Sequence, residues 1–244
     1  MIELKSISKH FGDLVALHPT DLSMTAGKTT VLIGPSGCGK STILRLIIGL
    51  LEPTTGYVEF EGERVSPDNI LELRRRMGYV IQDGGLFPHM TAAENVTLMV
   101  KHLKRPAKDM QRRLEELCEL THFPRDGLNR YPVELSGGQR QRVSLLRGLV
   151  LEPDVLLLDE PLGALDPMVR ASLQTDLKEI FQRLGKTVVL VTHDMAEAGY
   201  LGDRIVLLKE GRVVQQGTLE DLRERASDTF VSEFITAQRS LVQL

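Results

Sequence analysis

Short apolar runs alternate along the chain with longer segments in which apolar positions recur at helical spacing. The runs have the length of buried strands and lie at residues 31–33, 57–60, 78–81, 155–158 and 187–191. Helical spacing is found at residues 41–51, 110–120 and 167–184. Strands that alternate with helices predict a parallel sheet covered on both faces. The first thirty residues alternate instead as antiparallel strands do, with turns at 11–13 and 26–28.

Composition narrows the classes of protein that this pattern allows. Of the 244 residues, 42% are hydrophobic and 26% are charged, which predicts a folded globular chain. The net charge of -3 argues against a surface that coats nucleic acid. Two cysteines are too few for a disulfide framework and favour a reducing compartment. Apolar stretches such as 46–51 are far shorter than the ~20 residues of a membrane span, so we expect any membrane role to act through a partner.

A glycine-rich segment follows the first buried run and precedes a predicted helix. Residues 34–41 read GPSGCGKS and fit the pattern G-x-x-x-x-G-K-[ST]. Glycines let the backbone turn its N–H groups inward, which forms an anion site at the helix N-terminus. Lys40 would reach the β- and γ-phosphates of a nucleotide, and Ser41 would ligate Mg²⁺. The alternative is a glycine-rich turn without a ligand. The residues expected to bind nucleotide here are Gly34, Ser36, Gly37, Cys38, Gly39, Lys40, Ser41 and Thr42.

Two carboxylates end the apolar run at 155–158. The carboxyl ends of parallel strands open into one crevice, so we expect Asp159 and Glu160 to face the phosphate segment. Asp159 would then belong to the Mg²⁺ shell, and Glu160 would polarise a water molecule aimed at the γ-phosphorus. A solvated acidic strand end is the alternative.

A second glycine turn, LSGGQ at residues 135–139, precedes another predicted helix. Ser136 is a good N-cap, and two glycines with a hydroxyl at a helix N-terminus describe a further anion site. If the two sites lie too far apart to share a phosphate, two copies of the chain must meet face to face. The alternative is a plain capped helix.

These motifs together resemble the ATP-binding cassette (ABC) ATPases, and the resemblance covers essentially the whole chain. Residues 135–139 are similar to the family's signature sequence, which assigns Ser136, Gly137, Gly138 and Gln139 to the nucleotide of a partner subunit. Further matches are Phe11 as the adenine-stacking aromatic, Gln82 as the glutamine that senses Mg²⁺ and the attacking water, Asp166 in the stretch 164–166 that communicates between paired subunits, and His193 as the γ-phosphate histidine. The resemblance implies Glu160, His193 and Gln82 as catalytic residues and Ser41, Gln82 and Asp159 as Mg²⁺ ligands.

Structural roles remain open for each of these matches. Phe11 could be a core aromatic, and Gln82 an ordinary polar residue at a strand end. His193 could simply precede a helix that Asp194 caps, with Glu197 as the partner in a capping box. Asp166 with Pro167 forms an N-cap and N1 pair.

The resemblance implies an α/β fold with a P-loop nucleotide hydrolase core, an N-terminal antiparallel β subdomain and a helical signature subdomain. We expect one domain over residues 1–244. Its parts are an ATP-binding core with the β subdomain at 1–87 and 152–217, a helical signature subdomain at 88–151, and a short C-terminal helical tail at 218–244. Thr218 and Asp221 form the capping pair that opens the tail.

The segment 85–95 suggests a partner for this ATPase. It should expose Leu86, Phe87 and Met90, and in the family this region receives a short cytoplasmic helix of a membrane permease. The alternative is a local packing cluster. Residues 72–79, 163–167 and 213–217 further resemble the branch of importers that takes up osmoprotectants such as glycine betaine and choline.

The expected function is therefore ATP hydrolysis with Mg²⁺ that energises a binding-protein-dependent importer. The expected partners are a second copy or a homologous ATPase, integral permease subunits and, indirectly, an extracytoplasmic solute-binding protein; no nucleic acid is expected. The chain would lie at the cytoplasmic face of the membrane. The alternatives are import of another small solute and a soluble ABC ATPase of translation or DNA repair.

Overall fold

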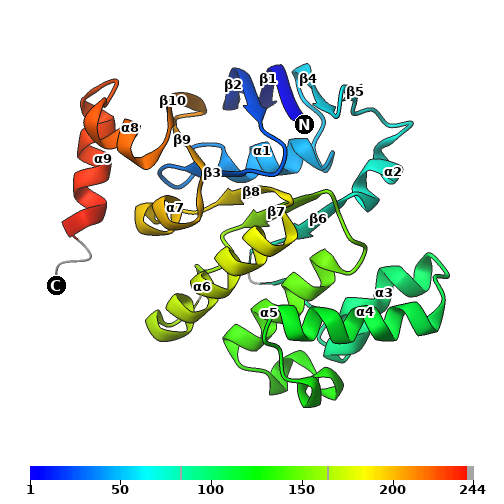
Figure 1. Cartoon of the computed structure of the whole chain (residues 1–244). Helices are drawn as coiled ribbons and strands as arrows, with labels where there is room; N and C mark the ends of the chain where they lie inside the picture. The colour runs from blue at the N-terminus through cyan, green and yellow to red at the C-terminus, as the bar shows by residue number, and fades with distance from the viewer. Residues whose placement is uncertain (83, 164, 241–244) are drawn as a thin grey trace. The chain divides into compact units, whose positions relative to one another are not determined.

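The computed structural model describes residues 1–82, 84–163 and 165–240, and Figure 1 traces their helices and strands. The chain forms two compact units. The first comprises residues 1–74 and 187–244, and the second comprises residues 75–186. The boundaries expected from the sequence at 87/88, 151/152 and 217/218 remain a prediction.

An antiparallel sheet begins the first unit. Its strand order is β2 (Leu14–Met24), β1 (Ile2–Phe11), β4 (Thr55–Phe60) and β5 (Glu63–Arg64). The side chains of Ile2, Leu4 and Ile7 in β1 are fully buried; Ile2 and Leu4 follow the alternating pattern, and a register shift at Ser6 turns Ile7 inward as well. The expected N-terminal antiparallel part is thus confirmed.

Parallel strands form the rest of the core of this unit. Strand β3 (Thr29–Ile33) pairs in parallel with both β8 (Thr187–Val191) and β9 (Arg204–Lys209), and β10 (Arg212–Gly217) pairs antiparallel with β9. Every residue of β3 and β8 is buried, because helices cover a parallel sheet on both faces. The helices of this part are α1 (Lys40–Ile47), α2 (Ile70–Arg75), α7 (Met195–Leu201), α8 (Leu219–Glu224) and α9 (Thr229–Ser240).

Helix α1 ends earlier than the sequence pattern predicts. Residues 41–51 have helical spacing, but Gly49 adopts a left-handed φ of 68°, which stops the helix. Arg74 donates from Nε to the Ile48 carbonyl at 3.0 Å and from Nη2 to the Gly49 carbonyl at 2.7 Å. Arg74 therefore caps α1 and is half-buried.

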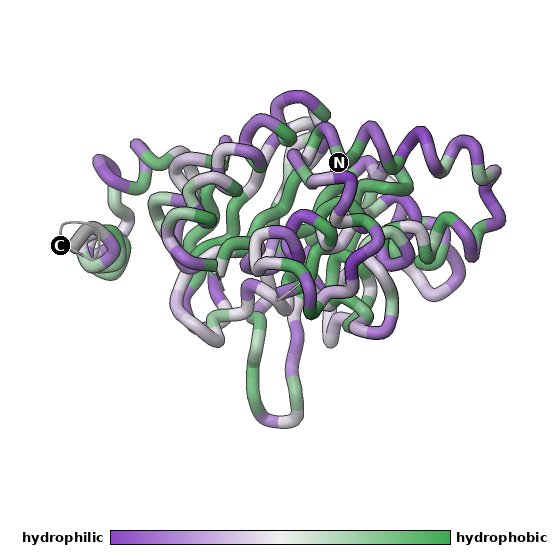
Figure 2. Tube along the Cα trace, turned by 90° about the horizontal axis from the view of Figure 1, so that it is seen from below, coloured by the Kyte–Doolittle hydropathy of each residue, from purple (hydrophilic) through white to green (hydrophobic). Residues whose placement is uncertain are grey.

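The second unit holds two parallel strands, β6 (Met77–Val80) and β7 (Val155–Asp159). Its helices are α3 (Ala92–His102), α4 (Ala107–Leu120), α5 (Gly137–Leu149) and α6 (Pro167–Leu184), with 3-10 turns η1 (Arg125–Asn129) and η2 (Pro132–Glu134). Helices α3 and α4 lie side by side in Figure 1. In Figure 2 hydrophobic and hydrophilic stretches alternate along the trace.

The architecture confirms the α/β class that the alternating pattern predicts. Helix α6 and strand β8 have the bounds expected from the sequence. Thr218 caps α8 in a capping box with Asp221, also as expected. In α4 the predicted apolar stripe buries Leu114 and Leu117, and Cys118 joins them.

Gly78 marks the closest approach of strand β6 to helix α5. A Cβ atom at this position would lie 2.2 Å from the Gly148 carbonyl oxygen. We predict that Gly78→Ala lowers the free energy of unfolding by about 2 kcal/mol, because the helix must shift away from the strand. Gly163→Ala is the matched control, since its Cβ would have an ordinary contact distance of 3.4 Å. Equal urea midpoints for the two variants would contradict this prediction.

Candidate functional site

The glycine-rich segment forms the loop between β3 and α1. Gly34 has a φ of 151°, and a Cβ atom there would lie 2.2 Å from the Leu208 carbonyl oxygen. Gly39 is the N-cap of α1, with a left-handed φ of 103°. Only glycine fits both positions, since a side chain would clash at the first and be strained at the second. The loop thereby leads directly into a helix N-terminus, the part of a helix that attracts anions.

The ammonium group of Lys40 lies over this loop. Its Nζ donates to the Gly34 carbonyl at 2.7 Å and to the Pro35 carbonyl at 3.0 Å, and the side chain is buried. Burial raises the pKa of the Cys38 thiol, and this effect outweighs the opposing effect of the nearby Lys40 charge. The thiol therefore stays protonated at neutral pH. The remaining predicted residues differ in exposure: Ser36 and Gly37 are exposed, and Ser41 and Thr42 are half-buried.

His193 leaves the sheet at the same edge as the loop. Leu32 of β3 pairs with Val191 of β8, so Gly34 and His193 each lie two residues beyond a paired position. His193 is exposed and directly precedes α7. The first unit therefore brings the predicted γ-phosphate histidine to the phosphate loop.

The turn around His193 differs from the expected capping box. Asp194 caps α7 by accepting from the backbone N–H groups of Ala196 and Glu197, as predicted. The carboxylate of Glu197, however, accepts from the Thr192 hydroxyl at 2.5 Å. Thr192 also accepts from the Asp194 N–H at 3.1 Å. Because Thr192 and Glu197 are both buried, these bonds fix the backbone on either side of His193.

Phe11 lies at the end of β1, in the turn that joins β1 to β2. Its side chain is 47% exposed, and the Lys9 ammonium lies 5.1 Å from the ring centroid. An exposed ring is not a core aromatic, so that alternative is wrong. A flat, exposed ring of this kind is suited to stacking on a base.

The second unit places its predicted catalytic residues at one strand edge. Val80 of β6 pairs with Leu158 of β7, so Gln82 and Glu160 each lie two residues beyond a paired position. Gln82 is exposed, Asp159 is buried and Glu160 is half-buried. The alternative of a solvated acidic strand end is therefore wrong for Asp159. Glu160 has a left-handed φ of 46°, and strained conformations of this kind cluster at functional sites.

The signature turn begins helix α5. Ser136 and Gln139 form a reciprocal capping box, in which the Ser136 hydroxyl accepts from the Gln139 N–H at 3.2 Å. A Cβ atom at Gly138 would lie 2.6 Å from Val169 Cγ1, so the start of α5 packs closely on the start of α6. Asp166 caps α6 by accepting from the Val169 N–H at 3.1 Å. The structure thus brings the N-termini of two helices together, while Ala164 lies outside the described residues.

The arginines of α5 have other partners than an anion at Ser136. Arg140 donates to the Leu135 carbonyl at 2.6 Å, and Arg142 pairs with Asp176 at 2.5 Å. Arg147 donates to the carbonyls of Gly84 and Gly85. Burial lowers the pKa of the Arg147 guanidinium from its ordinary value. Protein groups of the same unit therefore hold Arg142 and Arg147.

Asn95 organises the segment expected to meet a permease, although sequence analysis did not single it out. The Asn95 side chain is fully buried and accepts from the Phe87 N–H at 2.7 Å. It also donates to the carbonyls of Phe87, Met90 and Thr91. Phe87 is 42% exposed, whereas Leu86 and Met90 are half-buried, so Phe87 alone of these three side chains is exposed. The sequence feature that could have indicated this buried role is an asparagine placed between apolar positions of a helix.

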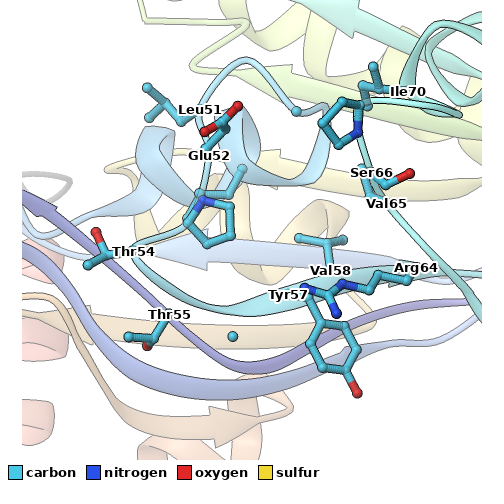
Figure 3. Close-up of a pocket in the computed structure, with 15 residues that line it drawn as sticks. Leu51, Glu52, Thr54, Thr55, Tyr57, Val58, Arg64, Val65, Ser66 and Ile70 are labelled. Atoms are coloured by element: carbon cyan, nitrogen blue, oxygen red, sulfur yellow. The ribbon is translucent and has the colours of Figure 1, made fainter.

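A hollow of about 890 Å³ lies elsewhere in the first unit. Figure 3 shows residues from the end of α1, the strand β4 and the segment before α2 around it, with the Arg64 guanidinium over the Tyr57 ring. Its lining includes none of the predicted site residues.

Two further features bear on the function. Among residues 1–82, 84–163 and 165–240, His, Cys, Asp and Glu side chains form no cluster of three that could hold a metal ion. Over the same residues, no helix has both the length and the apolar character needed to cross a bilayer.

Comparison with known proteins assigns the family. The loop, lysine and strand-end carboxylates define a P-loop nucleotide-binding fold. The family model described as ABC transporter matches residues 17–163. The chain therefore belongs to the ABC transporter family.

Individual relatives span most of the chain. The glycine betaine/carnitine/choline transport ATP-binding protein OpuCA of Bacillus subtilis is 46% identical over 98% of this chain and 63% of its own length. The sulfate/thiosulfate import ATP-binding protein CysA of Mesorhizobium japonicum is 45% identical over 98% of this chain and 70% of its own length. A dimeric ATP-binding cassette solved with ADP and Pi has a TM-score of 0.81 at 35% identity, over 90% of this chain and 99% of that one. The chain thus spans less than two thirds of the Bacillus subtilis relative.

Asn95 should determine the order of the segment that carries Phe87. We predict that Asn95→Ala lowers the free energy of unfolding by about 2 kcal/mol, because it leaves a buried N–H group and carbonyl groups without partners. Amide hydrogen exchange at residues 86–91 should accelerate. Thr97→Val is the control, since Thr97 lies on the same helix and its hydroxyl donates to the Ala93 carbonyl of that helix. Unchanged exchange at 86–91 in Asn95→Ala would show that other contacts hold the segment.

Proposed function

We propose that this chain is the ATP-hydrolysing subunit of a binding-protein-dependent importer. The observation that carries the proposal is the phosphate loop, in which a buried Lys40 lies over a glycine backbone that leads into the N-terminus of α1. Membership of the ABC transporter family supports ATP as the nucleotide.

The first unit would bind most of the nucleotide. The backbone N–H groups of residues 34–42 would surround the phosphates, and Lys40 would neutralise their charge. The exposed Phe11 ring would stack on adenine. The substrate would be Mg·ATP, and the donors available for Mg²⁺ are the Ser41 hydroxyl, the Asp159 carboxylate and the Gln82 amide oxygen. These hard oxygen donors fit an ion that takes few protein ligands and keeps several waters and phosphate oxygens.

Hydrolysis would depend on positioning and electrostatics. Glu160 would accept a proton from the attacking water, Gln82 would orient that water, and His193 would contact the γ-phosphate. Each of these residues follows a paired strand position, so strand pairing fixes the backbone position from which its side chain extends.

A second copy of the chain would complete each nucleotide site. Ser136, Gly137, Gly138 and Gln139 lie at a helix N-terminus and would approach the γ-phosphate bound by the partner, while Asp166 beside them would contact the partner loop. The dimeric cassette with ADP and Pi supports this arrangement. A homologous ATPase could take the place of the second copy.

Permease subunits would dock at the exposed Phe87, placing the chain at the cytoplasmic face of the membrane. The solute-binding protein would act through the permease. Relatives named for choline, carnitine, glycine betaine and osmoprotectant import, at 40–46% identity, support an osmoprotectant such as glycine betaine or choline. The sulfate/thiosulfate relative is nearly as similar, which keeps another small solute as the second candidate.

Glu160→Gln should separate nucleotide binding from hydrolysis. The amide keeps the shape of the side chain but cannot accept the proton of water, so we expect turnover to fall by a factor of about 100 or more. The variant should retain ATP and accumulate as a dimer, measured by size-exclusion chromatography with labelled nucleotide. Glu152→Gln, an exposed carboxylate of the same unit, is the control. Wild-type turnover in Glu160→Gln would remove Glu160 from its role.

Tagged protein purified from mildly solubilised membranes of its own cells tests the transport function. We expect a permease and a solute-binding protein to co-purify, and Phe87→Asp to abolish this because a charge enters an apolar contact. Leu71→Asp, at a side chain 67% exposed in the other unit, should leave it intact. Uptake of labelled glycine betaine and choline by the cells then tests the solute. Ribosomal proteins or nucleic acid without a permease would instead support a soluble ABC ATPase.

A further inference from the structure

Gln82 lies on a tight turn that begins where strand β6 ends. The Gly84 N–H donates to the Ile81 carbonyl at 3.1 Å, which closes a four-residue turn with Gln82 as its second residue. The position of the Gln82 backbone therefore depends on what holds the two ends of this turn. Strand β6 holds the first end, through its parallel pairing with β7.

Helix α5 holds the other end. Arg147 Nη2 donates to the Gly84 carbonyl at 2.7 Å, and Arg147 Nη1 donates to the Gly85 carbonyl at 2.8 Å. The buried Ser144 hydroxyl donates to the Gly84 carbonyl as well, at 2.9 Å. These donors come from successive turns of one helix face, three residues apart.

The chemistry of this contact requires both the arginine and the glycines. Two N–H groups of a planar guanidinium diverge in a fixed fork, which matches two successive carbonyls, whereas a lysine ammonium lacks this planar geometry. Gly84 and Gly85 adopt left-handed φ angles of 72° and 52°, which turn both carbonyls toward α5. A Cβ atom at Gly85 would lie 2.1 Å from Ile81 Cδ1, so a larger residue would have to displace the Ile81 side chain as well as adopt a left-handed φ.

We propose that Arg147, assisted by Ser144, is a positioning residue that fixes the Gln82 turn to the signature helix. The inference rests on the proposed function, because it assigns Arg147 to the same hydrolytic reaction. Helix α5 begins after its N-cap Ser136, and its axis rises by about 16 Å between Ser136 and Arg147. One rigid helix thus joins the residue offered to the partner's nucleotide to the turn that carries Gln82. Any displacement of α5 would therefore displace the turn with it.

Steady-state ATP hydrolysis by the co-purified complex tests this link. Arg147→Lys keeps the charge but loses the fork, and should lower kcat about tenfold, while the Kd of the purified chain for ATP stays within about twofold. Adding Arg147→Lys to Gln82→Ala should lower kcat no further than Gln82→Ala alone, because the arginine acts through the glutamine. Arg113→Lys is the matched control, since Arg113 donates to the Leu149 carbonyl of the same helix but not to the turn.

Additive effects of Arg147→Lys and Gln82→Ala, or wild-type kcat in either single variant, would overturn the proposal. Hydrogen exchange provides a readout that is independent of activity: the amides of residues 84–87 should exchange faster in Arg147→Lys, with α5 itself unchanged. Unchanged exchange at these amides would also overturn it. If Arg147→Lys does not fold, Ser144→Ala replaces it. This variant removes the second donor to the Gly84 carbonyl and should give a smaller effect of the same kind. An inactive wild-type complex would refute the proposed function. The exchange measurement would still report whether Arg147 holds the turn at Gly84 and Gly85.

Discussion

In a parallel ladder, evenly spaced hydrogen bonds fix each residue opposite a partner, so the residues that follow a paired position leave the sheet at the same edge. The pairing of Leu32 with Val191 carries the phosphate loop and His193 to one edge in the first unit. The pairing of Val80 with Leu158 does the same for Gln82 and Glu160 in the second. A shift of either pairing by one residue would turn the following side chain to the other face. Strand register therefore determines the chemistry of each half before any loop contact is considered.

Backbone carbonyls hold one functionally placed cation in each half. Lys40 donates to carbonyls of its own loop, and Arg147 donates to carbonyls of the Gln82 turn. Carbonyl dipoles orient a cation without cancelling its charge, whereas a carboxylate partner would neutralise it. For Lys40 this leaves a full positive charge available to phosphate oxygens. For Arg147 it gives direction, since the fork fits two carbonyls only in one orientation of the turn.

The sequence predicts strands β3, β4, β6, β7 and β8, helices α4 and α6 and the motif residues, because these depend on periodicity and on local chemistry; it indicates neither β9 nor β10. Helix α6 follows from its apolar spacing and from the Asp166–Pro167 start. Gly49 is a local signal that stops α1, but the capping of this helix by Arg74 is not predictable in this way, because Arg74 is distant in the chain. The roles of Asn95 and Arg147 escape sequence analysis for the same reason. Each acts through carbonyl groups, which every residue carries and no pattern of side chains reveals.

Three contacts leave little freedom to the chain between Gln82 and α3. The Gly84–Ile81 hydrogen bond closes the turn, Arg147 fixes the next carbonyls, and Asn95 ties the backbone at Phe87 to α3. Releasing Asn95 alone would break four hydrogen bonds, at a cost of roughly 1 kcal/mol each or more where a group stays buried. Moving this segment as one body therefore costs less free energy than breaking the hydrogen bonds that hold it. The exposed Phe87 ring is thereby tied both to α3 and, through Gly84 and Gly85, to the turn that carries Gln82.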